Sequence, residues 1–590
     1  AAARVVHTTR SSLTPTPSPA PLHSSFPRPV MSSPSPEGSK NGAKLVGMLL
    51  PNDARDLLAS ACEANPELKA KVIERVKSTS EDKCHKIFSK LKNAFQSGRT
   101  RPYEWRINQL RQLLKMIRDG RQVLCEALQK DLHRSVEEGY LYDLNGPEHN
   151  AQEAIDNLKE WMEGDTVPTN LLNLPASSKV HPDPLGVALI YGCWNYPYLL
   201  SVQPLVGAIA AGNTVAVKLP SDMAEHSSNA LARLMEEYLD TEAIVPILGG
   251  IRTNQALLKE RWDKIFFTGS TRVGKIVYAS AAQHLTPVTL ELGGKSPTIV
   301  CKSSNIEVAC RRVTWARYMN AGQSCIAPDH VFVHADVADK FKNRLCELIV
   351  KFYGTDAKKT EFFGRLVNRR SHARVVSIAQ EHKDKVLVGG VSDEKENYLS
   401  PTVVYYGSDW KAFTSSKAMS EEIFGPILPI ATFRDFSKVV DYINKGEKPL
   451  TSYLFSNDKK EQYIMTNQTT SGSLVINDCM VQMTNGDLPF GGVGASGIGA
   501  YHGKYSFDAF SHKKAVLIRS DKSTLDAPIR YPPYVPFKYN LLSFLQRARP
   551  AWQGRALRRV LQVAVLAMLF INRKKVALML HWVITILLGA

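Results

Sequence analysis

The sequence PLGVALIYGCWNYP (184–197) contains a short apolar run that is bounded by glycines and followed by a turn. A run of this length is typical of a buried strand. Two similar runs, NTVAVKL (213–219) and KIFFTGS (264–270), follow it, and helical patterns at 204–211 and 224–238 separate the three. Because strands that alternate with helices favour a parallel sheet with crossover connections, we predict an α/β fold with a doubly wound domain.

A second set of strand and helix patterns lies further along the chain. Helical patterns at 305–319 and 335–352 accompany four more apolar runs, which are SPTIV (296–300), HVFVHA (330–335), PILPIATF (426–433) and TSYLFS (451–456). Before the first set, apolar residues between Asp82 and Asp131 recur at helical spacing, which predicts two long amphipathic helices. The pattern predicts two α/β domains in tandem without an internal repeat.

The positive charge of the chain is concentrated at its two ends. The formal net charge is +18, and residues 1–50 hold five basic and one acidic side chain, whereas residues 511–590 hold fourteen and two. A nucleic-acid-binding protein needs its basic residues on a folded face, so this distribution argues against nucleic acid as a partner. Nine cysteines without a C-x-x-C pair argue against a disulfide framework and a thiolate zinc site, and we expect no metal.

The composition of both ends of the chain predicts that they lie outside the folded body. Residues 1–45 are rich in Ser, Thr and Pro, which predicts a disordered segment and leaves a targeting role open. Near the other end, the basic stretch 572–575 separates two apolar runs, 560–571 and 576–588. Each run is shorter than the roughly 18 to 20 residues that span a bilayer, but the basic flanks favour membrane anchoring over a soluble core helix. Whether the tail spans, dips into or lies on the membrane stays open.

Cys325, in GQSCIAPD (322–329), is a candidate nucleophile. A lone cysteine is more often buried and inert, but Glu291 ends a predicted strand and supplies a carboxylate beside two glycines. A carboxylate in an apolar cleft can act as a general base toward a thiol or a water. Asn195, after the first strand, supplies a side-chain amide of the kind that stabilises the oxyanion of acyl chemistry. Each residue alone is more often structural, so the prediction depends on their occurring together.

The segment FTGS (267–270), with Gly274 next, leads from a predicted strand into a helix. Free N–H groups and the helix dipole at such a start attract a pyrophosphate. The spacing G-S-x-x-x-G differs from the usual dinucleotide pattern G-x-G-x-x-G, so this segment alone is a weak signal.

Taken together, the motifs resemble those of the aldehyde dehydrogenase superfamily over roughly residues 95–517. They occur in the order PLGVALIYGCWNYP (184–197), AAGNTVAVK (210–218), FTGSTRVGK (267–275), LELGGKSP (290–297), GQSCIAPD (322–329), EEIFGP (421–426) and LPFGGVGASGIGAYHGKYSFDAFSH (488–512). The last motif, and SGRT near Arg99, resemble the class 3 branch that includes membrane-bound fatty aldehyde dehydrogenases. That branch carries a hydrophobic C-terminal anchor, which favours the same role for the tail.

The resemblance implies a role for each candidate site residue. Cys325 would be the nucleophile, Glu291 the general base, and Asn195 the oxyanion donor, helped by the main-chain amide of Cys325. NAD, with NADP as the alternative, would be the cofactor, and no metal is needed for this mechanism. The residues implied in binding the cofactor are Trp194, Lys218, Ser221, Gly269, Ser270, Gly274, Glu422 and Phe424.

The resemblance also implies a division of the chain. A Rossmann-like NAD(P)-binding domain with N-terminal helices would occupy residues 80–292, and an α/β catalytic domain with the nucleophile would occupy 293–475. The family's C-terminal motif, a bridging and oligomerisation segment, would occupy 476–517, followed by a linker and hydrophobic tail at 518–590. The protein would form a homodimer.

Two positions depart from the family pattern. The family usually has a carboxylate three residues after the lysine, but here Ser221 stands three residues after Lys218 and Asp222 follows it. A serine repels a 2′-phosphate less than a glutamate does, so NADP could be used as well as NAD. Cys193 stands where Ala or Pro is usual, and we expect it to be inert, with a redox-sensitive thiol as the alternative.

The resemblance therefore implies an NAD(P)-dependent oxidation of medium- to long-chain fatty aldehydes to carboxylic acids. We expect the enzyme to attach to the cytosolic face of the endoplasmic reticulum or the mitochondrial outer membrane. A soluble oxidant of short or aromatic aldehydes is the first alternative. A non-catalytic scaffold that retains the fold is the second, because fold alone does not establish activity.

Overall fold

The computed structural model describes residues 66–546 together with residues 559 and 563. The chain divides into two units, residues 1–79 and 80–590. In the first unit the described residues belong to helix α3 (Pro66–Gln96), which continues into the second. The predicted disordered segment lies outside the described residues, as do the two apolar runs of the tail apart from Val563.

The first large sheet has six strands. Its order is β17 (Gly497–Ile498), β7 (Val288–Glu291), β6 (Lys264–Thr268), β3 (Val187–Tyr191), β4 (Thr214–Lys218) and β5 (Ile244–Ile247). Strands β3 to β7 are parallel and β17 is antiparallel to β7. The connecting helices are α8 (Leu199–Ala211), α9 (Glu225–Tyr238), α10 (Ile251–Leu257) and α11 (Thr271–Ala282). Because the strands are parallel, the carboxyl ends of β3, β6 and β7 meet at one edge of this sheet.

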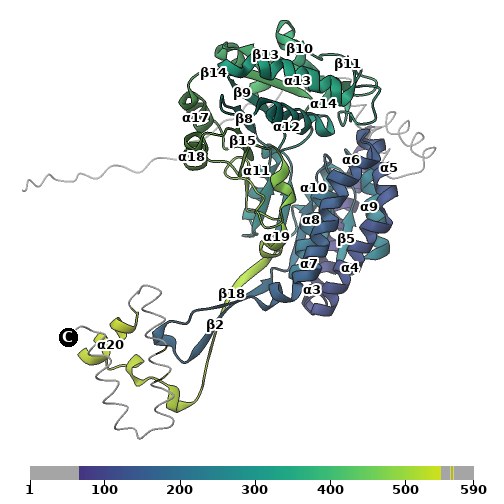
Figure 1. Ribbon diagram of the computed structural model, residues 1–590. Coiled ribbons are helices and arrows are strands. Elements are labelled where there is room, and N and C mark those ends of the chain that lie inside the picture. The colour runs from purple at the N-terminus through teal and green to yellow at the C-terminus, as the bar shows by residue number, and fades with distance from the viewer. Residues whose placement is uncertain (1–65, 547–558, 560–562, 564–590) are drawn as a thin grey trace, which may run out of the picture. The chain divides into compact units, whose positions relative to one another are not determined.

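Helices that precede the sheet pack against its crossover helices. They are α4 (Tyr103–Asp119), α5 (Arg121–Leu132), α6 (Val136–Gly139), the π-helical turn η1 (Tyr140–Leu144) and α7 (Asn145–Glu163). Helices α4, α7 and α8 lie side by side (Figure 1). The predicted pair of helices between Asp82 and Asp131 is wrong in number, because the second one breaks at Gly120 into α4 and α5.

The second large sheet has seven strands and holds the other half of the predicted runs. Its order is β10 (Val386–Val388), β13 (Thr402–Gly407), β14 (Ile427–Phe433), β9 (His330–His334), β8 (Pro297–Val300), β15 (Thr451–Phe455) and β16 (Ser473–Ile476). All neighbours are parallel except β10, which is antiparallel to β13. The predicted α/β class is therefore confirmed, with mainly parallel sheets that each carry one antiparallel edge strand.

Several helices and a hairpin complete this half of the chain. They are α12 (Ile306–Tyr318), η3 (Met319–Gly322), α13 (Ala338–Tyr353), α14 (Arg369–Glu381), α15 (Trp410–Ser415), α16 (Lys417–Ser420), α17 (Phe436–Lys445) and α18 (Lys459–Gln468), with the hairpin of β11 (Ser392–Asp393) and β12 (Tyr398–Leu399).

After the second sheet the chain returns to the first. Strand β17 joins the first sheet beside β7, where Gly497 pairs with Glu291. Helix α19 (Gly503–Ala509) then packs on α8, and β18 (Ser511–Arg519) completes a three-stranded antiparallel sheet with β2 (Ala176–Pro184) and β1 (Asp165–Val167). Helix α20 (Pro536–Gln546) follows. No helix within residues 66–546 is long and apolar enough to cross a membrane.

Candidate active site

The predicted catalytic residues lie where the first sheet meets the loop after α12. Asn195 follows β3, Glu291 is the last residue of β7, and Thr268, the last residue of β6, pairs with Glu291 in the parallel register. Cys325 lies in a turn three residues after η3. The carboxyl ends of parallel strands are the usual place for a ligand site in α/β proteins.

The loop before Cys325 has an unusual backbone. Three consecutive residues have positive φ angles, which are 51° at Asn320, 52° at Ala321 and 74° at Gly322. Residues other than glycine rarely adopt this left-handed backbone conformation. A Cβ at Gly322 would lie 2.4 Å from the main-chain oxygen of Gly425, so only glycine fits there. Strained backbone of this kind is concentrated at functional sites, where surrounding contacts hold it in place.

Two buried amide side chains hold this loop. Gln323 donates from Nε2 to the main-chain oxygens of Asn320 (3.1 Å) and Arg365 (2.9 Å). Its Oε1 accepts from the main-chain nitrogen of Val367 (3.0 Å). Nδ2 of Asn320 donates to the main-chain oxygens of Asn195 (2.9 Å) and Gln323 (3.2 Å), which joins the Cys325 loop to the Asn195 loop.

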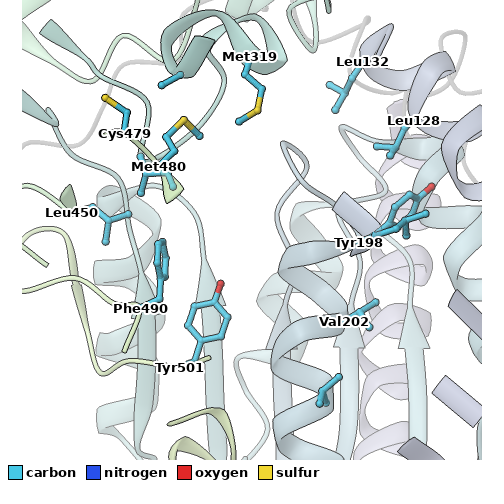
Figure 2. Close-up of a cluster of buried hydrophobic side chains, with 14 of the residues drawn as sticks. Leu128, Leu132, Tyr198, Val202, Met319, Leu450, Cys479, Met480, Phe490 and Tyr501 are labelled. Atoms are coloured by element: carbon cyan, nitrogen blue, oxygen red, sulfur yellow. The ribbon is translucent and has the colours of Figure 1, made fainter. Parts of the chain in front are cut away.

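A cavity of about 310 Å³ opens onto Cys325 and Glu291. Its walls come from η1 and α7, from the start of α8, from the Cys325 loop and from the segment between β16 and α19. Figure 2 shows four of the lining side chains, Met319, Met480, Phe490 and Tyr501. The other apolar lining residues are Leu141, Tyr142, Tyr196, Leu199, Leu200, Ile326 and Met483. The cavity can therefore hold an apolar chain with its reacting end at Cys325.

Burial governs the electrostatics of the two reacting groups. Both carboxyl oxygens of Glu291 are buried without a hydrogen-bond partner in the described structure, and burial raises the pKa of this carboxyl well above its usual value. Burial also raises the pKa of the Cys325 thiol, and the nearby Glu422 and Glu291 carboxylates raise it further. Burial therefore favours the neutral form of each group, and a nucleophilic Cys325 would first have to lose its proton.

Asn195 is buried next to the Cys325 loop. Its Nδ2 donates to the main-chain oxygen of Gln323, two residues before the cysteine, at 3.1 Å. Its Oδ1 is buried without a partner in the described structure. Because a carboxamide has two N–H donors, the second can be offered to a group bound at Cys325.

A second carboxylate, that of Glu422, lies near Cys325, and Phe424 two residues later contacts Trp194. Gly293 lies directly under Glu422, because a Cβ there would be 1.9 Å from Oε2, and the main-chain nitrogen of Gly294 donates to that carboxylate. Burial and the charge of Asp329 raise the pKa of Glu422 to about 8. Phe424 has a φ of 47°, and its ring meets Trp194 edge to face at 5.5 Å between centroids.

The remaining predicted cofactor residues lie at the ends of β4 and β6 and do not line the cavity. Lys218 is 3% exposed, and its Nζ donates to the main-chain oxygen of Leu219. Burial lowers the pKa of Lys218 to about 8, and Asp222 opposes that shift. Ser221 exchanges hydrogen bonds with the main chain of Gly249, whose nitrogen donates to Oγ at 2.9 Å.

The start of α11 has the arrangement that the sequence predicts for this segment. Ser270 caps the helix, and its Oγ accepts from the main-chain nitrogen of Val273. Gly274 is buried in the first turn of α11. The main-chain nitrogen of Gly269 donates to the main-chain oxygen of Glu291 at 3.0 Å. The turn at Gly269 is thus tied to the strand end that carries the candidate base.

Sequence reasoning missed the side chains that hold the Glu422 loop. Lys295 donates to Asp329 and to the main-chain oxygens of Ala418 and Glu421, while Asp329 accepts from the main-chain nitrogen of Ile423. Buried Arg317 donates to the main-chain oxygens on either side of the site, at Pro328 and Gly425. Lys295 lies within the motif LELGGKSP and Asp329 ends GQSCIAPD, so their place in these motifs was the available signal.

Comparison with known proteins shows which family the chain resembles. The profile of the Aldehyde dehydrogenase family matches residues 59–516. The chain is 42% identical over 444 residues to Aldehyde dehydrogenase family 3 member A2 of Macaca fascicularis, covering 75% of this chain and 90% of that protein. It is 41% identical to the mouse protein named Aldehyde dehydrogenase, dimeric NADP-preferring, covering 76% of this chain and 97% of that one.

Solved structures show the same fold. The substrate-bound AldH of Staphylococcus aureus superposes with a TM-score of 0.75 at 38% identity, covering 78% of this chain and 99% of that one. PnpE in complex with nicotinamide adenine dinucleotide superposes with a TM-score of 0.65 at 26% identity, covering 74% and 90%. These matches confirm the resemblance and the fold predicted from the motifs.

Proposed function

The chain belongs to the aldehyde dehydrogenase family, and we propose that it oxidises medium- to long-chain fatty aldehydes to carboxylic acids through a covalent intermediate on Cys325. The enzyme is an aldehyde dehydrogenase, and NAD or NADP fits as its cofactor. The observation that carries the proposal is the largely apolar cavity that ends at Cys325 and Glu291.

Cys325 begins the proposed reaction by attacking the aldehyde carbon as a thiolate. The C–S bond forms, the carbonyl oxygen becomes an alkoxide, and Asn195 with the main-chain N–H of Cys325 stabilises its charge. A nicotinamide held near Phe424 and Trp194 would supply the acceptor for the hydride that leaves when this alkoxide collapses. The product is a thioester on Cys325. Glu291 then takes a proton from a water that attacks this thioester, which releases the acid and returns the thiolate.

The residues present fit a dinucleotide. Lys218 is a buried cation with no carboxylate within ion-pair distance in the described structure, so its donors suit a ribose hydroxyl or a phosphate. Glu422 provides acceptors for hydroxyl groups, and Phe424 with Trp194 provides apolar surface for a flat ring. Gly269, Ser270 and Gly274 place the start of α11 beside the sheet edge, where a pyrophosphate would bind.

Ser221 supports use of both cofactors. A carboxylate at this position would repel a 2′-phosphate, whereas the hydroxyl of Ser221 carries no charge and already bonds to Gly249. The mouse relative is named NADP-preferring, which is consistent with tolerance of NADP in this branch.

We further propose that the protein acts as a homodimer. Strand β18 pairs with β2 along nine residues and ends with Leu517 and Ile518 exposed. An antiparallel arm with exposed apolar residues suits contact with a second copy. The mouse relative is named dimeric.

The tail would bind the enzyme to a membrane at its cytosolic face, on the endoplasmic reticulum or the mitochondrial outer membrane. Support comes from the two apolar runs at 560–571 and 576–588 and from the basic residues that flank them. Attachment would place the cavity near a substrate that dissolves in the bilayer.

Chain-length dependence tests the proposed substrate class. Turnover of hexanal, dodecanal and hexadecanal should give a kcat/KM that rises at least about tenfold along the series, because each buried methylene contributes about 0.8 kcal/mol. A polar substitution in the cavity wall, Met480→Gln, should flatten this rise with little change for propanal. A preference for benzaldehyde or propanal would instead favour the enzyme of short or aromatic aldehydes, and no turnover with any aldehyde would favour a scaffold.

A further inference from the structure

Arg134 and Asp143 form a buried ion pair that contacts the loop carrying Asn195. We propose that Arg134 and Asp143 form a positioning pair that fixes Asn195 where its amide can stabilise the oxyanion. This inference rests on the proposed role of Asn195. It concerns two residues that do not themselves line the cavity but contact two residues that do, Tyr196 and Leu199.

Asp143 fixes the start of the helix that follows Asn195. It lies in the π-helical turn η1 and is fully buried. Its Oδ1 accepts from the main-chain nitrogens of Tyr198 (3.0 Å) and Leu199 (2.7 Å), so it caps the first turn of α8. A capping carboxylate sets where and at what angle a helix begins. The loop from Asn195 to Pro197 is therefore anchored at its C-terminal side.

Arg134 reaches from Asp143 to the Asn195 loop itself. Its Nη1 donates to Oδ2 of Asp143 at 3.0 Å and to the main-chain oxygen of Asn195 at 3.5 Å. The guanidinium carbon lies 4.9 Å from the ring centre of Tyr196, the next residue. The main-chain oxygen of Asn195 also accepts from Nδ2 of Asn320. This oxygen is thus held from one side by Arg134 and from the other by the loop that carries Cys325.

The burial of this pair indicates a role in geometry. Arg134 is 1% exposed and Asp143 is fully buried, and removing two charges from water usually offsets what their attraction contributes. An oxyanion donor, in contrast, must lie within about 2.7 to 3.1 Å of the developing charge, so small displacements are costly. A planar guanidinium that makes hydrogen bonds to both Asp143 and the main-chain oxygen of Asn195 is well suited to limit displacement of that oxygen.

The alternative is that the pair only stabilises the fold between α5 and α7. The two accounts differ when Asn195 is absent. If Arg134 acts through Asn195, its loss should slow the chemistry only while the Asn195 amide is present. If it only stabilises the fold, its loss should have the same effect with or without that amide.

The experiment measures the first turnover of NADH formation from hexanal by the full-length enzyme. We expect Arg134→Met to slow this turnover about 10- to 100-fold in the wild-type background. In an Asn195→Ala background the same substitution should slow it by less than about threefold. The dissociation constant for NAD, measured by tryptophan fluorescence, should stay within about twofold in the wild type, the two single variants and the double variant. Neither Arg134 nor Asn195 is among the residues proposed to bind the cofactor.

Two further variants keep the test decisive. Asp143→Asn retains an acceptor oxygen for Tyr198 and Leu199 but loses the charge that holds Arg134, so it should show the same dependence on Asn195 and carries the test if Arg134→Met does not fold. Arg106→Met is the matched control, because Arg106 is also buried and bonds the other end of α8 at Ala210. Its effect, of any size, should be equal in both backgrounds.

The possible failures separate the two proposals. If Asn195→Ala slows the reaction but Arg134→Met adds the same factor in both backgrounds, the positioning pair is wrong and the role of Asn195 stands. If Asn195→Ala leaves the first turnover unchanged, the proposed oxyanion role is wrong and the positioning pair fails with it.

Discussion

The Cys325 loop and the Ser221 turn both carry residues of the candidate site, but they are held in different ways. The residues around Cys325 are buried, follow a left-handed stretch of backbone and are fixed by the side chains of Asn320 and Gln323. Ser221 is partly buried, its neighbour Asp222 is exposed, and its contact with Gly249 involves one hydroxyl group. A small shift in the first loop would misplace a reacting atom, whereas the second can accept different side chains. Changes in the first should affect chemistry, and changes in the second should affect cofactor choice.

The largest expected effect is that of removing the nucleophile. Cys325→Ala should lower aldehyde oxidation by at least about 10,000-fold, because Cys325 is the only thiol among the described residues that line the cavity. NAD affinity, measured by fluorescence titration, should change by less than about twofold. Cys193→Ala is the control, and we expect less than threefold loss from it. Substantial turnover by Cys325→Ala would contradict the assignment of the nucleophile.

The pH dependence should have opposite signs in the two regions. The pKa values of Cys325 and Glu291 are both raised, so their reactive ionised forms increase with pH, and kcat/KM for hexanal should rise up to about tenfold per pH unit between pH 6 and 9. The pKa of Lys218 is lowered to about 8, so its charge is lost above that pH and NADP should bind more weakly. If kcat/KM for hexanal and the affinity for NADP both rose, or both fell, with pH, the expected difference between the two regions would be contradicted.

Cofactor selectivity sharpens the comparison from the side of the turn. Ser221→Glu should lower kcat/KM with NADP about tenfold more than with NAD, because the new carboxylate would face the 2′-phosphate. Ser221→Gln, which has nearly the same size without the charge, is the matched control and should leave the ratio within about threefold. Equal losses with both cofactors in Ser221→Glu would mean that this turn does not face the 2′-position.

The smallest effect on chemistry should come from the tail. Deleting residues 551–590 should leave turnover of hexanal within about twofold, because none of the proposed catalytic residues lies there. The full-length protein should sediment with membranes after a high-salt wash, and the truncated protein should not, since burial of apolar side chains outweighs roughly 1 kcal/mol per basic residue. A truncated protein that still sediments, or a full-length chain that does not, would contradict membrane anchoring.

The sequence predicted the parts of the fold that depend on local patterns. Continuous apolar runs identified β3, β4, β6, β8, β9, β14 and β15, because a strand buried on both faces needs no alternation. Strand β17 was not foreseen. It has two residues, lies in a glycine-rich segment and pairs with Glu291 from about 200 positions away, so no local property indicates it. The break at Gly120 was missed because the helical pattern continues across it.

The site was predictable to the extent that its chemistry lies in side chains near motif glycines. Cys325, Glu291 and Asn195 could be proposed as catalytic because their side chains suit the chemistry and because they occur together in motifs that resemble those of the family. Arg134 and Asp143 could not be identified from the sequence. An arginine and an aspartate nine positions apart indicate nothing until the fold brings both into contact with the loop that carries Asn195. The left-handed backbone at Ala321 could not be foreseen either, because tertiary contacts impose it against the preference of that residue.

The most direct test of the account is to find the covalent intermediate. In Glu291→Gln, hydride transfer should occur once and hydrolysis should stall, so the enzyme should accumulate a thioester. Mass spectrometry of this variant after mixing with NAD and dodecanal should show the added dodecanoyl group, and peptide mapping should place it on the peptide that contains Cys325. An acyl group on the peptide that contains Cys193, or NADH formation with no acyl group on the protein, would contradict the central claim.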